Sequence, residues 1–144
     1  MFNTLISHLQ DPYFLLAIVI VVTIHEFAHA YAADHLGDPT PQLQGRLTLN
    51  PVAHLDLFGS VLFLLTGFGW GKPVQFDPFN LRDPKRDSML IALAGPASNI
   101  LTAIVVTLLL NVVYLAGLGN LFIPFFRQVI GLSVVLAIFN LIPI

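Results

Sequence analysis

The chain has 144 residues, of which 56% are apolar and 10% are charged, and its formal net charge is −2. Soluble domains carry about 25% charged residues, so this composition indicates an integral membrane protein surrounded by membrane lipid. The slightly negative charge gives no reason to expect nucleic acid as a partner. Cysteine is absent from the sequence, which excludes a disulfide framework, thiolate metal ligands and a cysteine nucleophile.

The first predicted element is a membrane-spanning helix over about residues 13–36. The stretch is largely apolar, and it is long enough to cross a bilayer at roughly 1.5 Å per residue. Asp11 and Pro12 form a typical helix start, with Asp as the cap and Pro at the first helical position. Gly37 is suited to end the helix. Residues 1–12 are expected to lie at the membrane interface.

This helix carries the sequence His25-Glu26-Phe27-Ala28-His29, an H-E-x-x-H pattern. Residues four apart share one helix face, so both imidazoles can reach one metal ion, and Glu26 can stand beside the ion without binding it. Zinc hydrolases use this layout: two histidines hold Zn²⁺, and the glutamate takes a proton from the attacking water. Ionisable groups within a lipid-length apolar run are costly and indicate a functional site. The alternative is a structural role in hydrogen bonds between helices.

The region of about residues 45–80 is predicted to contain short elements. Residues 47–49 are predicted as a short strand, and Asn50-Pro51 as the start of a helical turn that carries His54 and Asp56. His54 is a candidate metal ligand, a candidate substrate-binding group and a candidate hydrogen-bonding group within the loop. Spacing alone favours the last of these.

Two further elements are predicted in the same region. Residues 57–68 are apolar but too few for an untilted helical crossing, which predicts a re-entrant or buried segment. Residues 72–76 are predicted as an edge strand, a position in which Pro73 is tolerated. An edge strand beside a proteolytic site can pair with an extended substrate through backbone hydrogen bonds.

Two more membrane-spanning helices are predicted over about residues 89–118 and 121–144. The first contains Ala94-Gly95-Pro96-Ala97-Ser98-Asn99, whose small residues allow close helix packing. Asn99 either serves as a hydrogen-bonding group between helices or belongs to the active site. The second contains Asn140 and ends in apolar residues, so we expect the natural chain to continue past Ile144.

These elements together predict an all-α membrane protein with a single integral-membrane core over residues 1–144. It would have about three transmembrane helices, a re-entrant segment and a small membrane-associated β-hairpin or sheet. Five of the six Lys and Arg residues lie between the first two long apolar segments, so the positive-inside rule places that loop in the cytoplasm. This topology brings His25, Asn99 and Asn140 to a similar depth, toward the cytoplasmic side of the membrane.

In this order, the motifs resemble those of the site-2 protease family of intramembrane zinc metalloproteases, in its short form without a PDZ domain. The resemblance covers the chain from the H-E-x-x-H motif to Ile144. It rests on that motif, on Gly45-Arg46-Leu47-Thr48-Leu49-Asn50-Pro51 followed by His54-Leu55-Asp56, on Ala94-Gly95-Pro96-Ala97-Ser98-Asn99, and on Asn140-Leu141-Ile142-Pro143. The region Gly71-Lys72-Pro73-Val74 is similar to the family's membrane-associated strand.

The resemblance implies a multi-pass protein of the cell membrane that cleaves transmembrane segments of other proteins in regulated intramembrane proteolysis. It implies Zn²⁺ as cofactor, with His25 and His29 as ligands and Glu26 as the base. Asn99 and Asn140 match positions that contact the substrate or the developing oxyanion, and His54 is kept as a further candidate for such a contact.

The family's third zinc ligand is an Asp in a Leu-Asp-Gly motif shortly after the position of Pro143, and no residue of this chain matches it. We expect a longer natural chain to supply that Asp. The alternative function is that of a catalytically incomplete membrane-embedded protein, or a fragment, that binds transmembrane partners without cleaving them.

Overall fold

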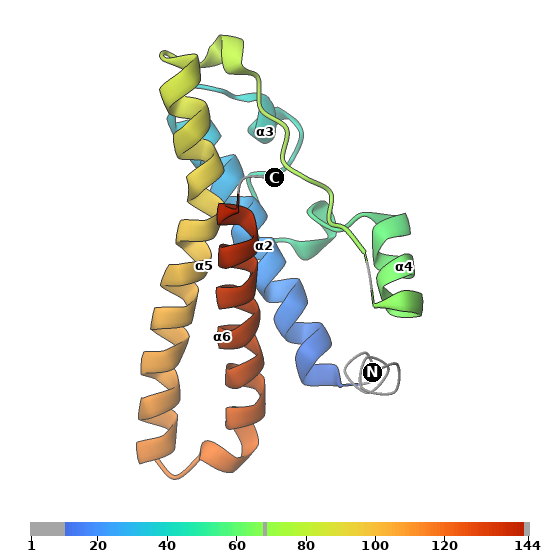
Figure 1. Ribbon diagram of the computed structural model, residues 1–144, viewed down its shortest axis with the longest axis vertical. Helices are drawn as coiled ribbons and strands as arrows, with labels where there is room; N and C mark the ends of the chain where they lie inside the picture. Colours follow the sequence, from blue (N-terminus) through green and yellow to red (C-terminus); the bar gives the residue numbers. More distant parts are fainter. Residues whose placement is uncertain (1–10, 68, 143–144) are drawn as a thin grey trace.

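The computed structural model describes residues 11–67 and 69–142. Three long helices, α2 (Pro12–His35), α5 (Pro84–Leu115) and α6 (Gly119–Leu141), lie side by side (Figure 1). Each of these three helices contains a stretch that is long and apolar enough to cross a membrane. This confirms the predicted helical membrane class, although the predicted interfacial residues 1–10, residue 68 and the end of the last crossing at 143–144 lie outside the described residues.

The ends of α2 follow from local sequence. The Asp11 side chain accepts a hydrogen bond of 2.9 Å from the Tyr13 backbone N–H, and Pro12 occupies the first turn. At the other end, Gly37 adopts a φ of 106° directly after the C-cap residue, a conformation that glycine adopts without steric cost. Both predicted signals therefore act as expected.

Helix α5 begins five residues earlier than the apolar pattern predicts, at Pro84 instead of residue 89. Its start repeats the start of α2, because the Asp83 side chain accepts a 3.1 Å hydrogen bond from the Arg86 backbone N–H and Pro84 stands in the first turn. The first turn is polar, since it contains Lys85 and Asp87. A polar first turn lies outside the hydrophobic pattern, so the cap predicts this boundary better than hydropathy does.

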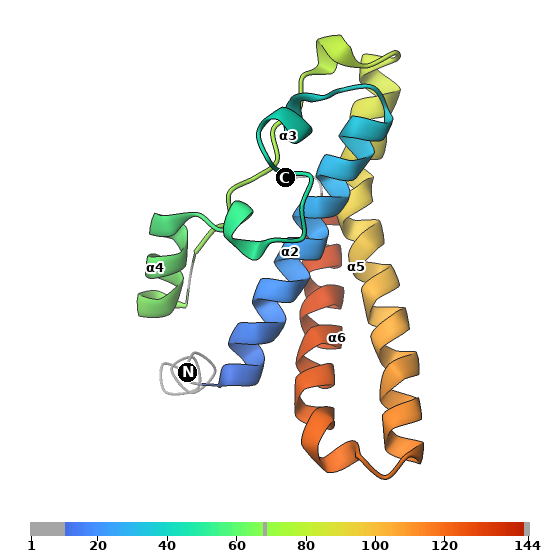
Figure 2. The ribbon, with the colours of Figure 1, turned by 180° about the vertical axis from the view of Figure 1, so that it is seen from behind.

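The region between α2 and α5 contains short helices and irregular backbone. In chain order, the helices are α3 (Thr40–Leu43), η1 (Pro51–Ala53), α4 (Leu57–Thr66) and η2 (Pro78–Asn80). The predicted helical turn is η1, and the predicted re-entrant segment contains α4. Helix α4 lies on the α2 side of the molecule and is separated from the three long helices in both views (Figure 1, Figure 2).

The predicted β-hairpin is not confirmed, because the described residues contain no strand and only one isolated antiparallel bridge, between Leu55 and Gly71. Pro73 has no N–H to donate, which limits any ladder along residues 72–76. In the predicted strand at 47–49, the Thr48 carbonyl oxygen and Thr48 Oγ1 already accept bonds from His54 and Asn50. These local bonds compete with strand pairing.

Two apolar clusters hold α2 against the rest of the bundle. One consists of Ala17 and Val21 from α2 with Val129 from α6, and the other contains Ala33 of α2 and Ile91 of α5. On α2, the two histidines of the H-E-x-x-H motif lie between these clusters. Packing on both sides therefore fixes the helix segment that carries the polar groups.

Candidate metal centre

The two histidines of the motif face each other across one turn of α2. Their Nε2 atoms are 3.1 Å apart, and their ring planes meet at 84°. Only 4% of His25 is exposed. Two imidazoles bound to one tetrahedral zinc ion at 2.0–2.1 Å place their nitrogens about 3.3 Å apart, so the observed separation is close to that of a zinc-binding pair.

One stripe of α5 packs against these rings. Ile91, Gly95 and Asn99 are four residues apart, so they share a helix face. His29 Nδ1 lies 2.7 Å from the Ile91 carbonyl oxygen, and the Asn99 side-chain amide lies 3.0 Å from His25 Nδ1. The predicted convergence of His25 and Asn99 at one depth is therefore present in the structure.

The tautomer of His29 follows from its contact with α5. A carbonyl oxygen accepts hydrogen bonds and never donates, so the proton of a neutral His29 sits on Nδ1. The Nε2 lone pair then points toward His25 Nε2. This is the arrangement that metal-binding histidines commonly adopt, with the second ring nitrogen donating to an outer acceptor.

Gly95 allows the α5 backbone to approach the two rings closely. A Cβ atom at this position would lie 2.6 Å from His25 Cε1 and 2.7 Å from His25 Nε2, and it would also collide with His29 Nε2. A methyl group would therefore occupy the space in front of both Nε2 atoms. The small residue, predicted as an aid to helix packing, thus brings the α5 backbone close to both candidate ligands without a steric clash.

Glu26 is held by the irregular segment that follows α4. Its carboxylate oxygen Oε2 accepts a 3.1 Å hydrogen bond from the backbone N–H of Val74. The segment 72–76 is thus fixed against α2 beside the two histidines, although it forms no ladder. This bond orients the carboxylate that the motif predicts as the base.

Buried Arg46 and His54 position this segment. Arg46 is 4% exposed, and its guanidinium donates to the carbonyl oxygens of Ala53 and, at 3.1 Å, Lys72. The Lys72 N–H donates in turn to the His54 carbonyl oxygen at 2.8 Å. Together these bonds join residues 46–54 to the segment that reaches Glu26.

The His54 side chain takes part in hydrogen bonding within the loop. It is fully buried, and its Nε2 donates to the Thr48 carbonyl oxygen at 2.7 Å. This contact agrees with the interpretation that spacing favoured. In the described part of the chain, His54 is not among the residues that line the cavity beside His25.

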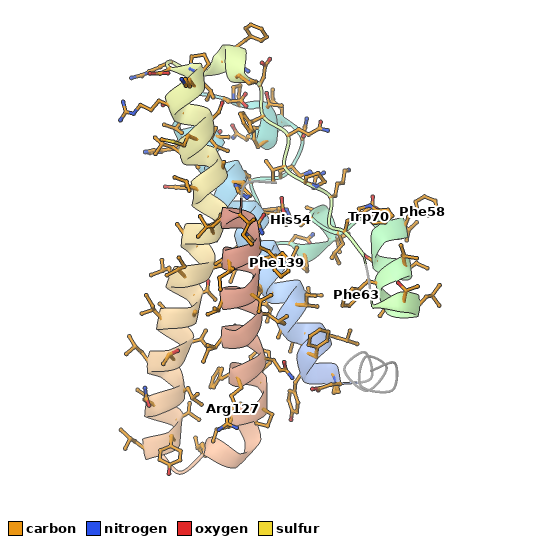
Figure 3. The ribbon with its side chains drawn as sticks, viewed as in Figure 1. His54, Phe58, Phe63, Trp70, Arg127 and Phe139 are labelled. Atoms are coloured by element: carbon orange, nitrogen blue, oxygen red, sulfur yellow. The ribbon has the colours of Figure 1, made fainter. Side chains whose placement is uncertain are left out.

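A cavity of about 570 Å³ opens beside His25 and Glu26. Its walls are mostly apolar and come from α2, α4, residues 69–71 and the end of α6. Phe63 projects from α4 toward α2, whereas Phe58 projects away from the bundle (Figure 3). Asn140 also lines the cavity, and its side-chain amide donates to the Leu136 carbonyl oxygen at 2.8 Å.

Residues 11–67 and 69–142 contain no group of three His, Cys, Asp or Glu side chains arranged to hold one metal ion. The described candidate centre therefore consists of two imidazoles and an adjoining carboxylate. Catalytic zinc sites normally have three protein ligands.

Sequence reasoning missed two backbone groups of this site, the Ile91 carbonyl and the Val74 N–H. Every residue except proline carries both kinds of group, so they leave no sequence signature. The sequence predicted no hydrogen-bonding role for Arg46. Its place within the Gly45–Pro51 motif was the available signal that it has a specific partner.

A helix-borne imidazole pair with an adjoining carboxylate, set in a bundle of apolar helices, defines a membrane protein with a metallohydrolase-like site. The chain belongs to peptidase family M50, whose family model matches residues 13–121. This membership agrees with the resemblance to the site-2 proteases.

Two relatives extend this comparison. The chain is 40% identical over 139 residues to "Putative zinc metalloprotease YwhC" of Bacillus subtilis (strain 168), covering 92% of this chain and 64% of the relative. It is 36% identical over 87 residues to "Putative zinc metalloprotease Rip2" of Mycolicibacterium smegmatis (strain ATCC 700084 / mc(2)155), covering 56% of this chain and 33% of that relative. The chain thus spans less than two thirds of either relative's length. No solved structure matches it.

Proposed function

We propose that this chain is the core of an intramembrane zinc metalloendopeptidase that hydrolyses peptide bonds in or near transmembrane segments of other membrane proteins. The regulated proteolysis of such segments would be its role in the cell membrane. One observation carries the proposal: the Nε2 atoms of His25 and His29 converge to 3.1 Å beside a cavity that Glu26 also lines.

His25 and His29 would hold the zinc ion, and the absence of a side chain at Gly95 keeps both rings free of a clash with α5. When bound, zinc polarises a carbonyl group and makes water acidic enough to be deprotonated near neutral pH. Because catalytic zinc normally has three protein ligands, we propose that an Asp completes the site as the third ligand, as the resemblance to the site-2 proteases implies.

Glu26 would act as the general base. The Val74 N–H holds its carboxylate at 3.1 Å, so one oxygen is fixed and the other remains available to take a proton. Asn140 lines the same cavity, and its amide is proposed to contact the substrate or the developing oxyanion.

The apolar walls of the cavity fit an apolar substrate segment. We propose that a transmembrane segment unwinds locally and enters between α2 and α4, because a helix hides its own peptide bonds in hydrogen bonds. The backbone of residues 72–76 would pair with the extended substrate. We propose that this end of the bundle faces the cytoplasm, as the positive-inside rule favours.

The decisive experiment replaces the base while leaving the ligands in place. In the natural protein, purified in detergent, Glu26→Gln is expected to lower cleavage of a model transmembrane substrate by about 10²-fold or more, since general bases contribute 10²–10⁴-fold. Bound zinc, measured by elemental analysis, is expected to stay at the wild-type level.

The matched control is Asp34→Asn, which makes the same carboxylate-to-amide change on the same helix, away from the cavity. It should cleave as the wild type does. Wild-type cleavage by Glu26→Gln would contradict the base assignment. Absence of zinc from the active wild-type protein would contradict the proposed zinc hydrolase itself, and zinc without any cleavage would favour the non-catalytic binding protein.

A further inference from the structure

We propose that Asn99 is a positioning residue for the metal ligand His25: its side-chain oxygen accepts the Nδ1 proton of His25 and so keeps the Nε2 lone pair directed at the ion. This role differs from the substrate or oxyanion contact that the family resemblance implies for Asn99. The inference rests on the proposed zinc site at His25 and His29.

The two histidines need different partners to reach the same state. For both Nε2 atoms to bind one ion, both must present lone pairs, so each ring must carry its proton on Nδ1. The Ile91 carbonyl oxygen serves His29 in this way at 2.7 Å. The Asn99 side-chain amide lies 3.0 Å from His25 Nδ1, and the Gly95 backbone is a further hydrogen-bond partner of the His25 ring.

The carboxamide of Asn99 has an oxygen to offer. Asn99 is fully buried, and its Oδ1 has no hydrogen-bond partner among the described residues. The two ends of a carboxamide have nearly the same shape, so the hydrogen-bonding network decides which end faces a neighbour. A protonated Nδ1 on His25 requires the oxygen end, and the contact distance of 3.0 Å suits that bond.

The position of Asn99 favours an effect on the ring over an effect on the substrate. Asn99 is absent from the residues of the described chain that line the cavity beside His25 and Glu26. It lies on the far side of the His25 ring, two turns after Ile91 on the same stripe of α5.

The test compares three variants in the natural protein, purified in detergent. Asn99→Leu keeps the approximate volume and removes the acceptor, and we expect it to weaken Zn²⁺ affinity about 10–100-fold, the usual effect of losing an outer partner of a histidine ligand. Asn99→Asp keeps an acceptor oxygen and is expected to bind Zn²⁺ nearly as the wild type does. Chelator competition measures both affinities, and thermal unfolding checks that each variant folds.

The matched control is Asn111→Leu, the same substitution three turns further along α5, where the exposed Asn111 amide donates to the Thr107 carbonyl oxygen. It should leave Zn²⁺ affinity unchanged. A purely structural role for Asn99 predicts the reverse ranking, with the buried carboxylate of Asn99→Asp at least as harmful as the apolar Leu.

A measurement on the unmodified protein keeps the inference testable if a variant fails to fold. With ¹⁵N-labelled histidine and Zn²⁺ bound, NMR should show the His25 proton on Nδ1. An unprotonated Nδ1, or equal Zn²⁺ affinity in Asn99→Leu and wild type, would overturn the role of Asn99. The proposed zinc site itself would be overturned if the wild-type protein did not bind Zn²⁺ and if His25→Ala and His29→Ala showed the same lack of Zn²⁺ binding.

Discussion

At the scale of single residues, the site depends on one missing side chain as much as on those present. Gly95 stands where a Cβ would meet both imidazoles, and the helices α2 and α5 approach there because nothing projects between them. The sequence predicted close packing at this position from its small residues. It did not reveal that the atoms packed against the glycine are the candidate metal ligands, because that depends on how α2 and α5 meet.

Gly95→Ala is therefore expected to displace the His25 ring and lower Zn²⁺ affinity at least about 5-fold. Overpacking of this kind costs typically 1–3 kcal/mol, and a cost of about 1 kcal/mol on the metal-binding geometry corresponds to that factor. Zinc content and chelator competition in the purified natural protein measure the effect.

Gly131→Ala on α6 is the control, since a Cβ there meets no atom within 4 Å. An alanine in a helix interior is favoured over glycine by roughly 0.5–1 kcal/mol, so this variant should keep its zinc and melt at the same temperature or slightly higher. Equal zinc affinity in Gly95→Ala and Gly131→Ala would show that Gly95 does not border the ion.

At the scale of elements, the connection between α2 and α5 is organised by one buried carboxylate. Asp38 is fully buried, and its two oxygens accept hydrogen bonds from the Thr40 backbone N–H and hydroxyl, the Asn80 amide and the Asp77 N–H. These bonds tie the residues after α2 to η2, just before α5. Because the segment that reaches Glu26 lies between these points, the Asp38 cluster helps to fix its path.

The pKa of Asp38 lies below its ordinary value of 3.8: burial alone would raise the pKa, but the hydrogen bonds from Thr40, Asn80 and Asp77 outweigh that effect. A carboxyl group whose pKa is lower in the folded state than in the unfolded state stabilises the fold at any pH above its unfolded-state pKa. This stabilisation is lost as the pH falls through the folded-state pKa. The Asp38 contribution should therefore stay constant at neutral and mildly acidic pH and decline only below about 3.8.

Asp38→Asn tests this cluster. An amide offers one acceptor oxygen where the carboxylate offers two, so at least one buried donor loses its partner at a cost of about 1–3 kcal/mol. We expect a lower melting temperature at neutral pH and faster proteolysis between residues 77 and 83. The control is Asp34→Asn, because the Asp34 side chain makes no hydrogen bond in the described structure, and it should have the melting temperature of the wild type. If Asp38→Asn has the same melting temperature as Asp34→Asn, the Asp38 cluster does not stabilise the fold.

At the scale of the whole molecule, the distribution of charge and apolar surface supports the proposed membrane orientation. Many of the large apolar side chains on the long helices are exposed, among them Leu101, Leu108 and Val112 of α5, as expected for surfaces that face lipid. Five of the six cationic side chains lie between α2 and the first turn of α5, and the sixth, Arg127, lies near the opposite end of the bundle (Figure 3).

Cysteine labelling tests the orientation in a chain that has no natural cysteine. Lys85→Cys lies at the start of α5, and Leu118→Cys lies in the turn before α6, where Leu118 is 58% exposed. A membrane-impermeant maleimide added to intact cells is expected to label Leu118→Cys and to label Lys85→Cys only after the membrane is opened. The opposite pattern would place the loop and the candidate metal centre outside the cytoplasm.

The sequence by itself determined the membrane class, both ends of α2 and the pairing of His25 with His29. Each of these depends on local properties: apolar length, capping residues and a spacing of one helical turn. Only the tertiary structure decided that Ile91 and Val74 provide backbone partners for His29 and Glu26, and that the expected strands do not pair. Backbone groups are alike at almost every residue, so the packing of α2 against α5 and against the segment after α4 selects which of them the site uses.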